Sequence, residues 1–197
     1  KLLKKKLGIV DELTKGIDFL FKKNKVTKYI GTAKILSPNE IEIINNEKAE
    51  IINADKIIIA TGSESTNLPN INIDEKKIVT STGALELDKV PEKMIVIGAG
   101  IIGLEMGTVW RRLGAEVEVV EYLPRILPGI DDEIANNFMK ILQKQGVKFK
   151  LAHSVEKAQI INDKVLLSVK DINNNAYDEL EADVGLVSVG RKPNTNG

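Results

Sequence analysis

Residues 93–107 read KMIVIGAGIIGLEMG, and this stretch decides the fold of the chain. The apolar run Met94–Ile97 predicts a buried β-strand. It leads into a GxGxxG loop and then into apolar residues at helical spacing, which predict a helix that stops at Gly114. Val117–Val120 predict the next strand. A strand, a glycine loop, a helix and a second strand in this order are typical of a dinucleotide-binding βαβ unit.

Each glycine of the loop has a distinct predicted role. Gly98 permits the tight turn, Gly100 lets a pyrophosphate approach the backbone, and Gly103 lets the helix pack closely on the strand. The N-terminus of the helix offers unpaired N–H groups and partial positive charge to phosphates. The alternative is that these are packing glycines of an ordinary α/β unit. The residues predicted to bind the dinucleotide are Gly98, Ala99, Gly100, Ile101, Ile102 and Gly103.

Glu121 predicts the choice of dinucleotide. It ends the second strand, 18 residues beyond Gly103, near the spacing of the acid that binds the adenine ribose. Its carboxylate can accept hydrogen bonds from both ribose hydroxyls and would repel a 2′-phosphate. The next residues, Tyr122-Leu123-Pro124, include no arginine. The sequence therefore predicts NAD rather than NADP, against the alternative of an ordinary carboxylate at a strand end.

The segments before the glycine loop predict a different organisation. Lys1–Lys23 has the pattern of an amphipathic helix, and Val26–Asp55 that of a small antiparallel meander. The apolar run Ile57–Ala60 predicts a buried parallel strand that ends in a small-residue turn. Glu64–Pro91 carries prolines and charged residues and is predicted to be a connector.

The segments after Glu121 continue the α/β pattern. The predicted elements are a helix capped by Asp131 or Asp132 and ended by Gly146, a strand at Phe149–Ala152, a hairpin of Gln159–Ile161 with Val165–Val169 that turns at Asn162-Asp163-Lys164, and a last strand at Val184–Val189. Together these elements predict the α/β class, with a Rossmann-type, three-layer dinucleotide domain.

Composition excludes several classes of function. Lys+Arg and Asp+Glu both total 28, which argues against nucleic acid or a membrane surface as a partner chosen by bulk charge. No apolar run is long enough to span a bilayer, and we expect no targeting segment. The 197 residues contain no cysteine and one histidine. These residues therefore form no disulfide, thiolate site or histidine-rich metal site.

Several motifs resemble one known family. The stretch 93–107, together with STGAL at 81–85, VEYL at 120–123, ILQKQG at 141–146 and VGRKP at 189–193, closely resembles the dihydrolipoamide dehydrogenases. These belong to the flavoprotein disulfide reductases, and the resemblance covers essentially the whole chain. It implies oxidation of protein-bound dihydrolipoamide with FAD and NAD, in which this chain supplies the NAD pocket.

The resemblance also implies a division into domains. Residues 1–78 would be part of an FAD-binding domain with a linker, 79–189 the NAD-binding domain, and 190–197 the start of the return to the FAD domain. The family's FAD-binding glycine loop, cysteine pair and His–Glu base match no residue here. We therefore expect a central fragment that holds no catalytic residue and is inactive alone.

The resemblance assigns further residues to the two cofactors. On the NAD side, Ile102 takes the place of a gating aromatic, Glu105 would meet the nicotinamide carboxamide, Val155 would flank the adenine, and Gly190 would lie by the nicotinamide-side ribose. On the FAD side it assigns Ala33, Thr61, Gly62, Ser63 and Arg191. Four of these assignments have ordinary alternatives: the carboxylate of Glu105 in the first turn of a helix favours the helix dipole, Val155 packs in a core, Arg191 lies at the surface, and the small-residue turn that ends at Ser63 is a plain turn.

The resemblance implies partners and a location for the full-length protein. These are the lipoyl domains of 2-oxoacid dehydrogenase complexes, a second copy in a homodimer, and either the bacterial cytoplasm or the mitochondrial matrix. Two other functions remain open. One is another FAD/NAD(P) disulfide reductase or an NADH oxidase, and the other is a non-catalytic NAD-binding module.

Overall fold

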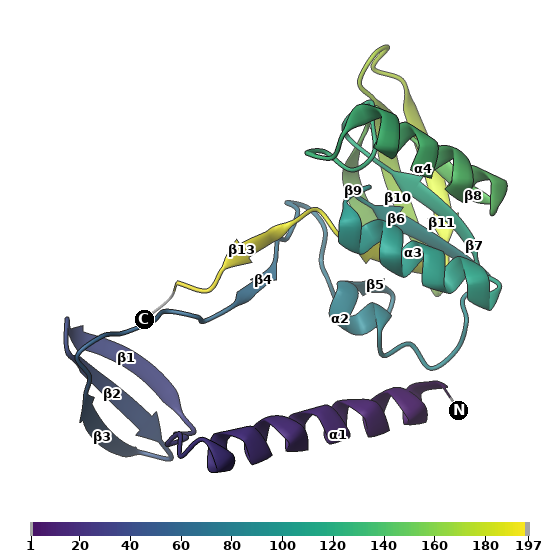
Figure 1. Ribbon diagram of the computed structural model, residues 1–197. Coiled ribbons are helices and arrows are strands. Elements are labelled where there is room, and N and C mark those ends of the chain that lie inside the picture. The colour runs from purple at the N-terminus through teal and green to yellow at the C-terminus, as the bar shows by residue number, and fades with distance from the viewer. Residues whose placement is uncertain (1, 196–197) are drawn as a thin grey trace. The chain divides into compact units, whose positions relative to one another are not determined.

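The computed structural model describes residues 2–195, and these divide into two compact units. One contains residues 2–62 with 193–195, and the other is Ser63–Lys192. The second unit contains the glycine loop and extends at both ends beyond the 79–189 expected for the NAD-binding domain. Figure 1 labels the helices and most of the strands.

The first unit consists of a long helix and a small sheet. Its elements are α1 (Leu2–Lys23), β1 (Thr32–Ser37), β2 (Glu40–Asn45) and β3 (Lys48–Asn53), and the strands pair antiparallel in the order β1-β2-β3. The predicted helix and meander are therefore confirmed, except for Lys1, which lies outside the described residues. The helix has no buried residue, so its apolar stripe is exposed.

The prediction of a buried strand at Ile57–Ala60 is wrong in this structure. These residues form no strand, and the side chains of Ile58 and Ile59 are 90% and 70% exposed. A parallel strand is buried only where neighbouring strands pair with its backbone and other elements cover its faces. No strand within residues 2–195 pairs with this segment, so its apolar side chains remain in solvent.

A parallel sheet forms the middle layer of the second unit. Its strands are β5 (Ile78–Val79), β12 (Val184–Val187), β6 (Lys93–Ile97), β7 (Glu116–Val120) and β8 (Val147–Lys150), which pair in that order. All four pairings are parallel. Residues 64–91, predicted to be a connector, thus contribute an edge strand, β5.

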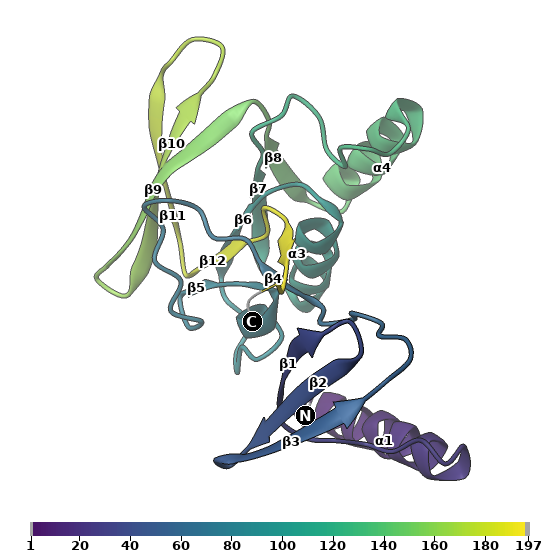
Figure 2. The ribbon, with the colours of Figure 1, turned by 90° about the vertical axis from the view of Figure 1, so that its left-hand side faces the viewer.

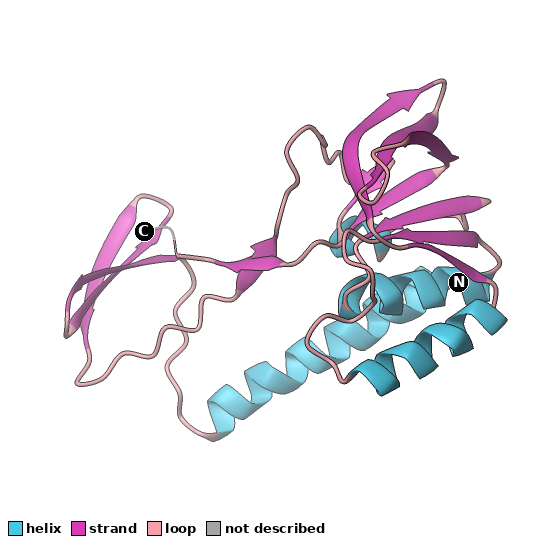
Figure 3. Cartoon of the chain, turned by 90° about the horizontal axis from the view of Figure 1, so that it is seen from above, coloured by secondary structure: helices cyan, strands magenta, loops and turns pink. Residues whose placement is uncertain are grey.

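Three helices cover one face of this sheet (Figure 3). They are α2 (Ser81–Ala84), α3 (Ile101–Leu113) and α4 (Asp132–Lys144). Gly114 ends α3 with a φ of 116°, a left-handed conformation that favours glycine. Asp131 caps α4, because its side chain accepts hydrogen bonds from the N–H groups of Glu133 and Ile134.

An antiparallel sheet covers the opposite face (Figure 2). It contains β9 (His153–Ile161), β10 (Lys164–Asp171) and β11 (Tyr177–Ala182), in the order β11-β10-β9. The predicted hairpin is confirmed. Its turn residues Asn162 and Asp163 have φ values of 51° and 64°, as two-residue type I′ turns require. The sequence reading missed β11.

Alternating side chains of the parallel sheet supply two cores. Met94 and Val96 pack with α3 and α4, whereas Ile95 and Ile97 pack with the antiparallel sheet. Successive side chains of a strand point to opposite faces, so a continuous apolar run fits a strand buried on both sides. The predicted three-layer α/β architecture is confirmed.

A two-stranded ribbon completes the structure. It pairs β4 (Ser63–Ser65) with β13 (Arg191–Pro193). The N–H of Thr66 donates to the carbonyl of Gly190 at 3.0 Å, and the N–H of Asn194 donates to the carbonyl of Gly62 at 3.1 Å. The two segments therefore run antiparallel, one before and one after the three-layer part of the chain.

Candidate dinucleotide site

The glycine loop lies at the carboxyl edge of the parallel sheet, where the strand order reverses. The chain passes from β6 through β7 to β8 on one side, while β12 and β5 lie on the other side. Ligands of open α/β sheets bind in the crevice at such a point. The predicted loop therefore lies at the position in the sheet where such ligands bind.

The three glycines of the loop have different surroundings. A Cβ built on Gly98 would lie 2.6 Å from the carbonyl O of Ser188, and one on Gly103 would lie 2.3 Å from the carbonyl O of Gly98. A Cβ on Gly100 would meet no atom within 4 Å. Two of the glycines thus allow close packing, and Gly100 leaves space open above the backbone.

Backbone and side-chain hydrogen bonds hold the loop at its start. The N–H of Gly98 donates to the carbonyl of Val120 at 2.8 Å. The hydroxyl of Ser188, just after β12, donates to the carbonyls of Ile97 at 2.9 Å and Gly98 at 3.2 Å. The sequence reading did not identify Ser188. The only signal for it was a small polar residue directly after an apolar strand.

Glu121 lies against the glycine loop. Its Oε2 accepts a hydrogen bond from the backbone N–H of Ala99 at 2.6 Å, and its Oε1 accepts one from the N–H of Leu123 at 2.8 Å. The side chain is buried, with 8% of its surface exposed. The structure thus brings the predicted ribose acid to the predicted phosphate loop.

The N-terminus of α3 has no side-chain cap. Its N-cap residue, Gly100, makes no capping hydrogen bond. By contrast, Thr80 caps α2 and Asp131 caps α4 through their side chains. The first N–H groups of a helix have no partner within the helix, so at α3 they are available to an anion.

The other residues assigned to NAD lie around this edge in varied settings. Ile102 is half-buried in the first turn of α3, and Glu105 is exposed. Val155 is half-buried near the start of β9, two residues beyond His153, whose N–H donates to the carbonyl of Glu121 at 2.9 Å. Gly190 is exposed and has a φ of 115°, which favours glycine.

The residues assigned to FAD fall into two groups. Ser63 and Arg191 are in contact, since the Arg191 guanidinium donates from Nε to the Ser63 hydroxyl at 2.8 Å and from a second nitrogen to the Ser63 carbonyl. Ala33, Thr61 and Gly62 belong to the other unit. Ala33 is exposed on β1, and the Thr61 hydroxyl donates to the carbonyl of Asn194 at 2.6 Å.

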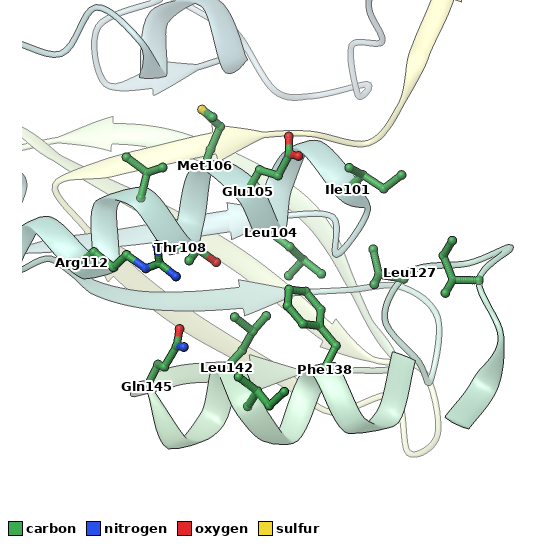
Figure 4. Close-up of a pocket in the computed structure, with 13 residues that line it drawn as sticks. Ile101, Leu104, Glu105, Met106, Thr108, Arg112, Leu127, Phe138, Leu142 and Gln145 are labelled. Atoms are coloured by element: carbon green, nitrogen blue, oxygen red, sulfur yellow. The ribbon is translucent and has the colours of Figure 1, made fainter. Parts of the chain in front are cut away.

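A separate groove of about 760 Å³ lies between α3 and α4 (Figure 4). Its lining is mostly apolar and includes Leu104, Phe138 and Leu142. Glu105 is also at its border, but its carboxylate points away from Phe138 (Figure 4). An apolar lining suits apolar groups rather than a pyrophosphate, so the glycine loop remains the candidate site.

Residues 2–195 contain neither a candidate metal site nor a membrane-spanning helix. No group of three or more His, Cys, Asp or Glu side chains there is arranged to hold a metal ion. No helix in this part of the chain is long and apolar enough to cross a membrane.

Comparison with known proteins identifies similar chains. A family model described as pyridine nucleotide-disulphide oxidoreductase matches residues 2–197. The mitochondrial dihydrolipoyl dehydrogenase of Dictyostelium discoideum is 51% identical over 191 residues, which are 95% of this chain and 39% of that protein. The dihydrolipoamide dehydrogenase of Chaetomium thermophilum is 49% identical over 199 residues, which cover 100% of this chain and 40% of that protein.

A solved structure agrees with the fold. The HOCl-induced flavoprotein disulfide reductase RclA from Escherichia coli matches with a TM-score of 0.81 at 26% identity, over 98% of this chain and 43% of that one. The resemblance predicted from the motifs is therefore confirmed. The chain spans about two fifths of the length of the curated relatives, 39% and 40% in the two cases above.

Proposed function

Because the chain belongs to the pyridine nucleotide-disulphide oxidoreductase family, we propose that it is the NAD-binding part of a dihydrolipoamide dehydrogenase. The whole enzyme would oxidise dihydrolipoamide carried on a protein, with FAD and NAD as cofactors. Identity of 51% to a dihydrolipoyl dehydrogenase, against 26% to the disulfide reductase RclA, favours this function over that of RclA.

One observation carries the proposal, namely the open space above Gly100. Gly98 and Gly103 are closely packed, whereas a Cβ on Gly100 would touch nothing. Close packing therefore does not explain the glycine at position 100. Space at this position and an uncapped N-terminus of α3 together suit a pyrophosphate, which needs close approach and unpaired N–H groups.

The proposed NAD pocket assigns a task to each part of the site. The N–H groups of Gly100 and of the first turn of α3 would bind the pyrophosphate, since those of Gly98 and Ala99 already donate to Val120 and Glu121. Glu121 would accept hydrogen bonds from the adenine ribose, and Val155 would flank the adenine. Ile102, Glu105 and Gly190 would lie on the nicotinamide side. NAD, when bound there, supplies a hydride acceptor, and this chain's residues bind and orient it.

The FAD side is proposed only for the full-length protein. Arg191 and Ser63, already in contact, would lie near the flavin, and Thr61 and Gly62 would provide the small-residue turn beside it. Ala33 would lie by the adenine end of FAD. The cysteine pair that exchanges electrons with the flavin would come from other segments, since these 197 residues contain no cysteine.

Partners and location follow from the proposed activity. The substrate would be carried on lipoyl domains of 2-oxoacid dehydrogenase complexes, and the enzyme would be a homodimer. The Dictyostelium relative is named as mitochondrial. This supports the mitochondrial matrix over the bacterial cytoplasm for the present protein.

Mapping NADH on the purified chain by two-dimensional NMR tests the proposed pocket. We expect saturable shifts of the backbone amides of residues 98–103, Glu121 and Val155. The amide of Phe138, in the groove between α3 and α4, serves as the internal control and should not move. Shifts centred on that groove, or no saturable shifts, would contradict the proposal.

A further inference from the structure

Ala99 connects the glycine loop to the segment that follows β7 through both of its backbone polar groups. Its N–H donates to Oε2 of Glu121 at 2.6 Å. Its carbonyl accepts the N–H of Leu127 at 2.9 Å. Ala99 is fully buried, so neither group can turn to water instead. These two bonds therefore hold the loop at Ala99, in addition to the bonds that hold it at Gly98.

Glu121 makes a second bond of the same kind, to the N–H of Leu123 at 2.8 Å. One carboxylate thus receives two backbone N–H donors, one on each oxygen. Hydrogen bonds from neutral donors to an ionised acceptor are shorter and stronger than neutral ones. A nearly buried carboxylate needs such partners, because burial without them is costly.

We propose that Glu121 is a positioning residue for the glycine loop and holds it in its binding geometry before a dinucleotide arrives. This rests on the proposed function, and it adds a task to the ribose contact. Each carboxylate oxygen has more than one lone-pair direction. Ribose hydroxyls can therefore donate to Glu121 while Ala99 and Leu123 keep their bonds. Affinity for the phosphate portion of a ligand then depends on Glu121, although that portion never touches it.

Replacement by glutamine separates this proposal from a role in the ribose contact alone. Glutamine has nearly the same shape but a single acceptor oxygen, and its NH₂ group is a donor. In Glu121→Gln one of the two N–H groups, of Ala99 or Leu123, would face another donor. Glu116→Gln is the matched control, because Glu116 lies on β7, the strand that directly precedes Glu121, and pairs with Lys148 at the surface.

The first test uses the ligand-free chain and NMR hydrogen exchange. In the unmodified chain we expect the Ala99 amide to be protected and its proton shifted downfield. In Glu121→Gln we expect the amide that faces the new NH₂ group, that of Ala99 or Leu123, to exchange at least tenfold faster and its proton to move upfield, while amides of β10 keep their protection. Glu116→Gln should resemble the unmodified chain. An Ala99 amide that exchanges freely in the unmodified chain would overturn the proposal without any variant.

The second test uses two ligands, each of which contains only one of the two recognised parts of the dinucleotide. Inorganic pyrophosphate has no ribose, and adenosine has no phosphate. We expect Glu121→Gln to bind both at least threefold more weakly than the unmodified chain, as measured by amide shifts. Loss of adenosine binding with unchanged pyrophosphate binding would mean that Glu121 acts through the ribose alone.

The two proposals fail in different ways. If the unmodified chain binds no NADH, the proposed function fails, while hydrogen exchange at Ala99 still decides whether Glu121 positions the loop. If NADH binds and Glu121→Gln leaves the exchange rates at both Ala99 and Leu123 and the affinity for pyrophosphate unchanged, the positioning role is refuted and the NAD pocket stands.

Discussion

A Cβ on Gly103 would lie 2.5 Å from the hydroxyl oxygen of Ser188, so the first turn of α3 packs directly on the end of β12. The same Cβ would lie 2.3 Å from the carbonyl of Gly98. Real Cβ atoms do not approach backbone oxygens so closely. Any side chain at Gly103 must therefore push α3 away from the loop that precedes it.

We expect Gly103→Ala to destabilise the three-layer unit by about 1–3 kcal/mol, the usual cost of overpacking a core. The cost reaches the upper part of this range because one obstacle is backbone rather than the end of a flexible side chain. Urea unfolding followed by circular dichroism measures the change. Gly100→Ala is the control, since its Cβ meets open space. Equal stability of the two variants would contradict the packing role of Gly103.

Gly100→Val should abolish detectable NADH binding and leave the fold intact. The φ of Gly100 is −76°, which valine adopts without strain, and the new side chain would occupy the space proposed for the pyrophosphate. NADH fluorescence titration gives the affinity, and the urea midpoint reports the fold. Normal binding by Gly100→Val would mean that the glycines serve packing only.

The unmodified chain should bind NADH at least tenfold more tightly than NADPH. A 2′-phosphate would meet the Glu121 carboxylate, and no arginine follows directly to compensate. Glu121→Ala should reduce the ratio of NADH affinity to NADPH affinity. It should do so mainly by weakening the binding of NADH, because the loss of paired hydrogen bonds to a ribose is costly. Parallel titrations with the two cofactors measure both ratios. Equal affinities in the unmodified chain would refute the assignment of NAD.

Low pH should lower the free energy of unfolding of the three-layer unit, in part because Asp183 becomes protonated. Burial opposes ionisation of this side chain, but hydrogen bonds from Lys164 and from the N–H of Lys93 outweigh it and hold the pKa of Asp183 below its ordinary 3.8. A carboxyl whose pKa is lower in the folded state stabilises the fold above its unfolded pKa. This contribution is lost as the pH falls through the folded value.

The corresponding variant is Asp183→Asn. The free energy of unfolding of the unmodified chain should decline as the pH is lowered below about 4, near the ordinary pKa of an aspartate, and the decline should be shallower in Asp183→Asn. Urea unfolding at a series of pH values measures both slopes. Asp88→Asn, at an exposed position, is the control and should keep the full slope. Identical slopes in all three proteins would exclude Asp183.

The local sequence pattern correctly predicted those elements whose packing partners are also part of this chain. Met94–Ile97 is apolar throughout because both of its faces are covered, and Gly114 ends α3 where the backbone needs a left-handed residue. Ile57–Ala60 has the same apolar character, yet it is exposed because no neighbouring strand is present among the described residues. An apolar run indicates a need for burial and does not provide it.

Other elements carry too little local signal to be predicted. The two residues of β5 show no periodicity, and β11, an edge strand with the sequence YDELEA, has three charged residues and no regular alternation. At the site, spacing predicted that Glu121 lies near the loop, but not that its carboxylate bonds to Ala99. That bond, like the Ser188 contact, joins distant segments and depends on how the strands are ordered in the sheet.

The pairing of β4 with β13 bears on how this part of the molecule can be handled in the laboratory. Thr66 and Gly190 are hydrogen-bonded neighbours, so the three-layer unit begins and ends at one place on its own surface. A segment with adjacent ends can be excised, joined head to tail and reopened elsewhere, or grafted into a loop of another host. Circular permutants opened at the exposed turn of Asn162 and Asp163 would retain every strand pairing of the parallel sheet.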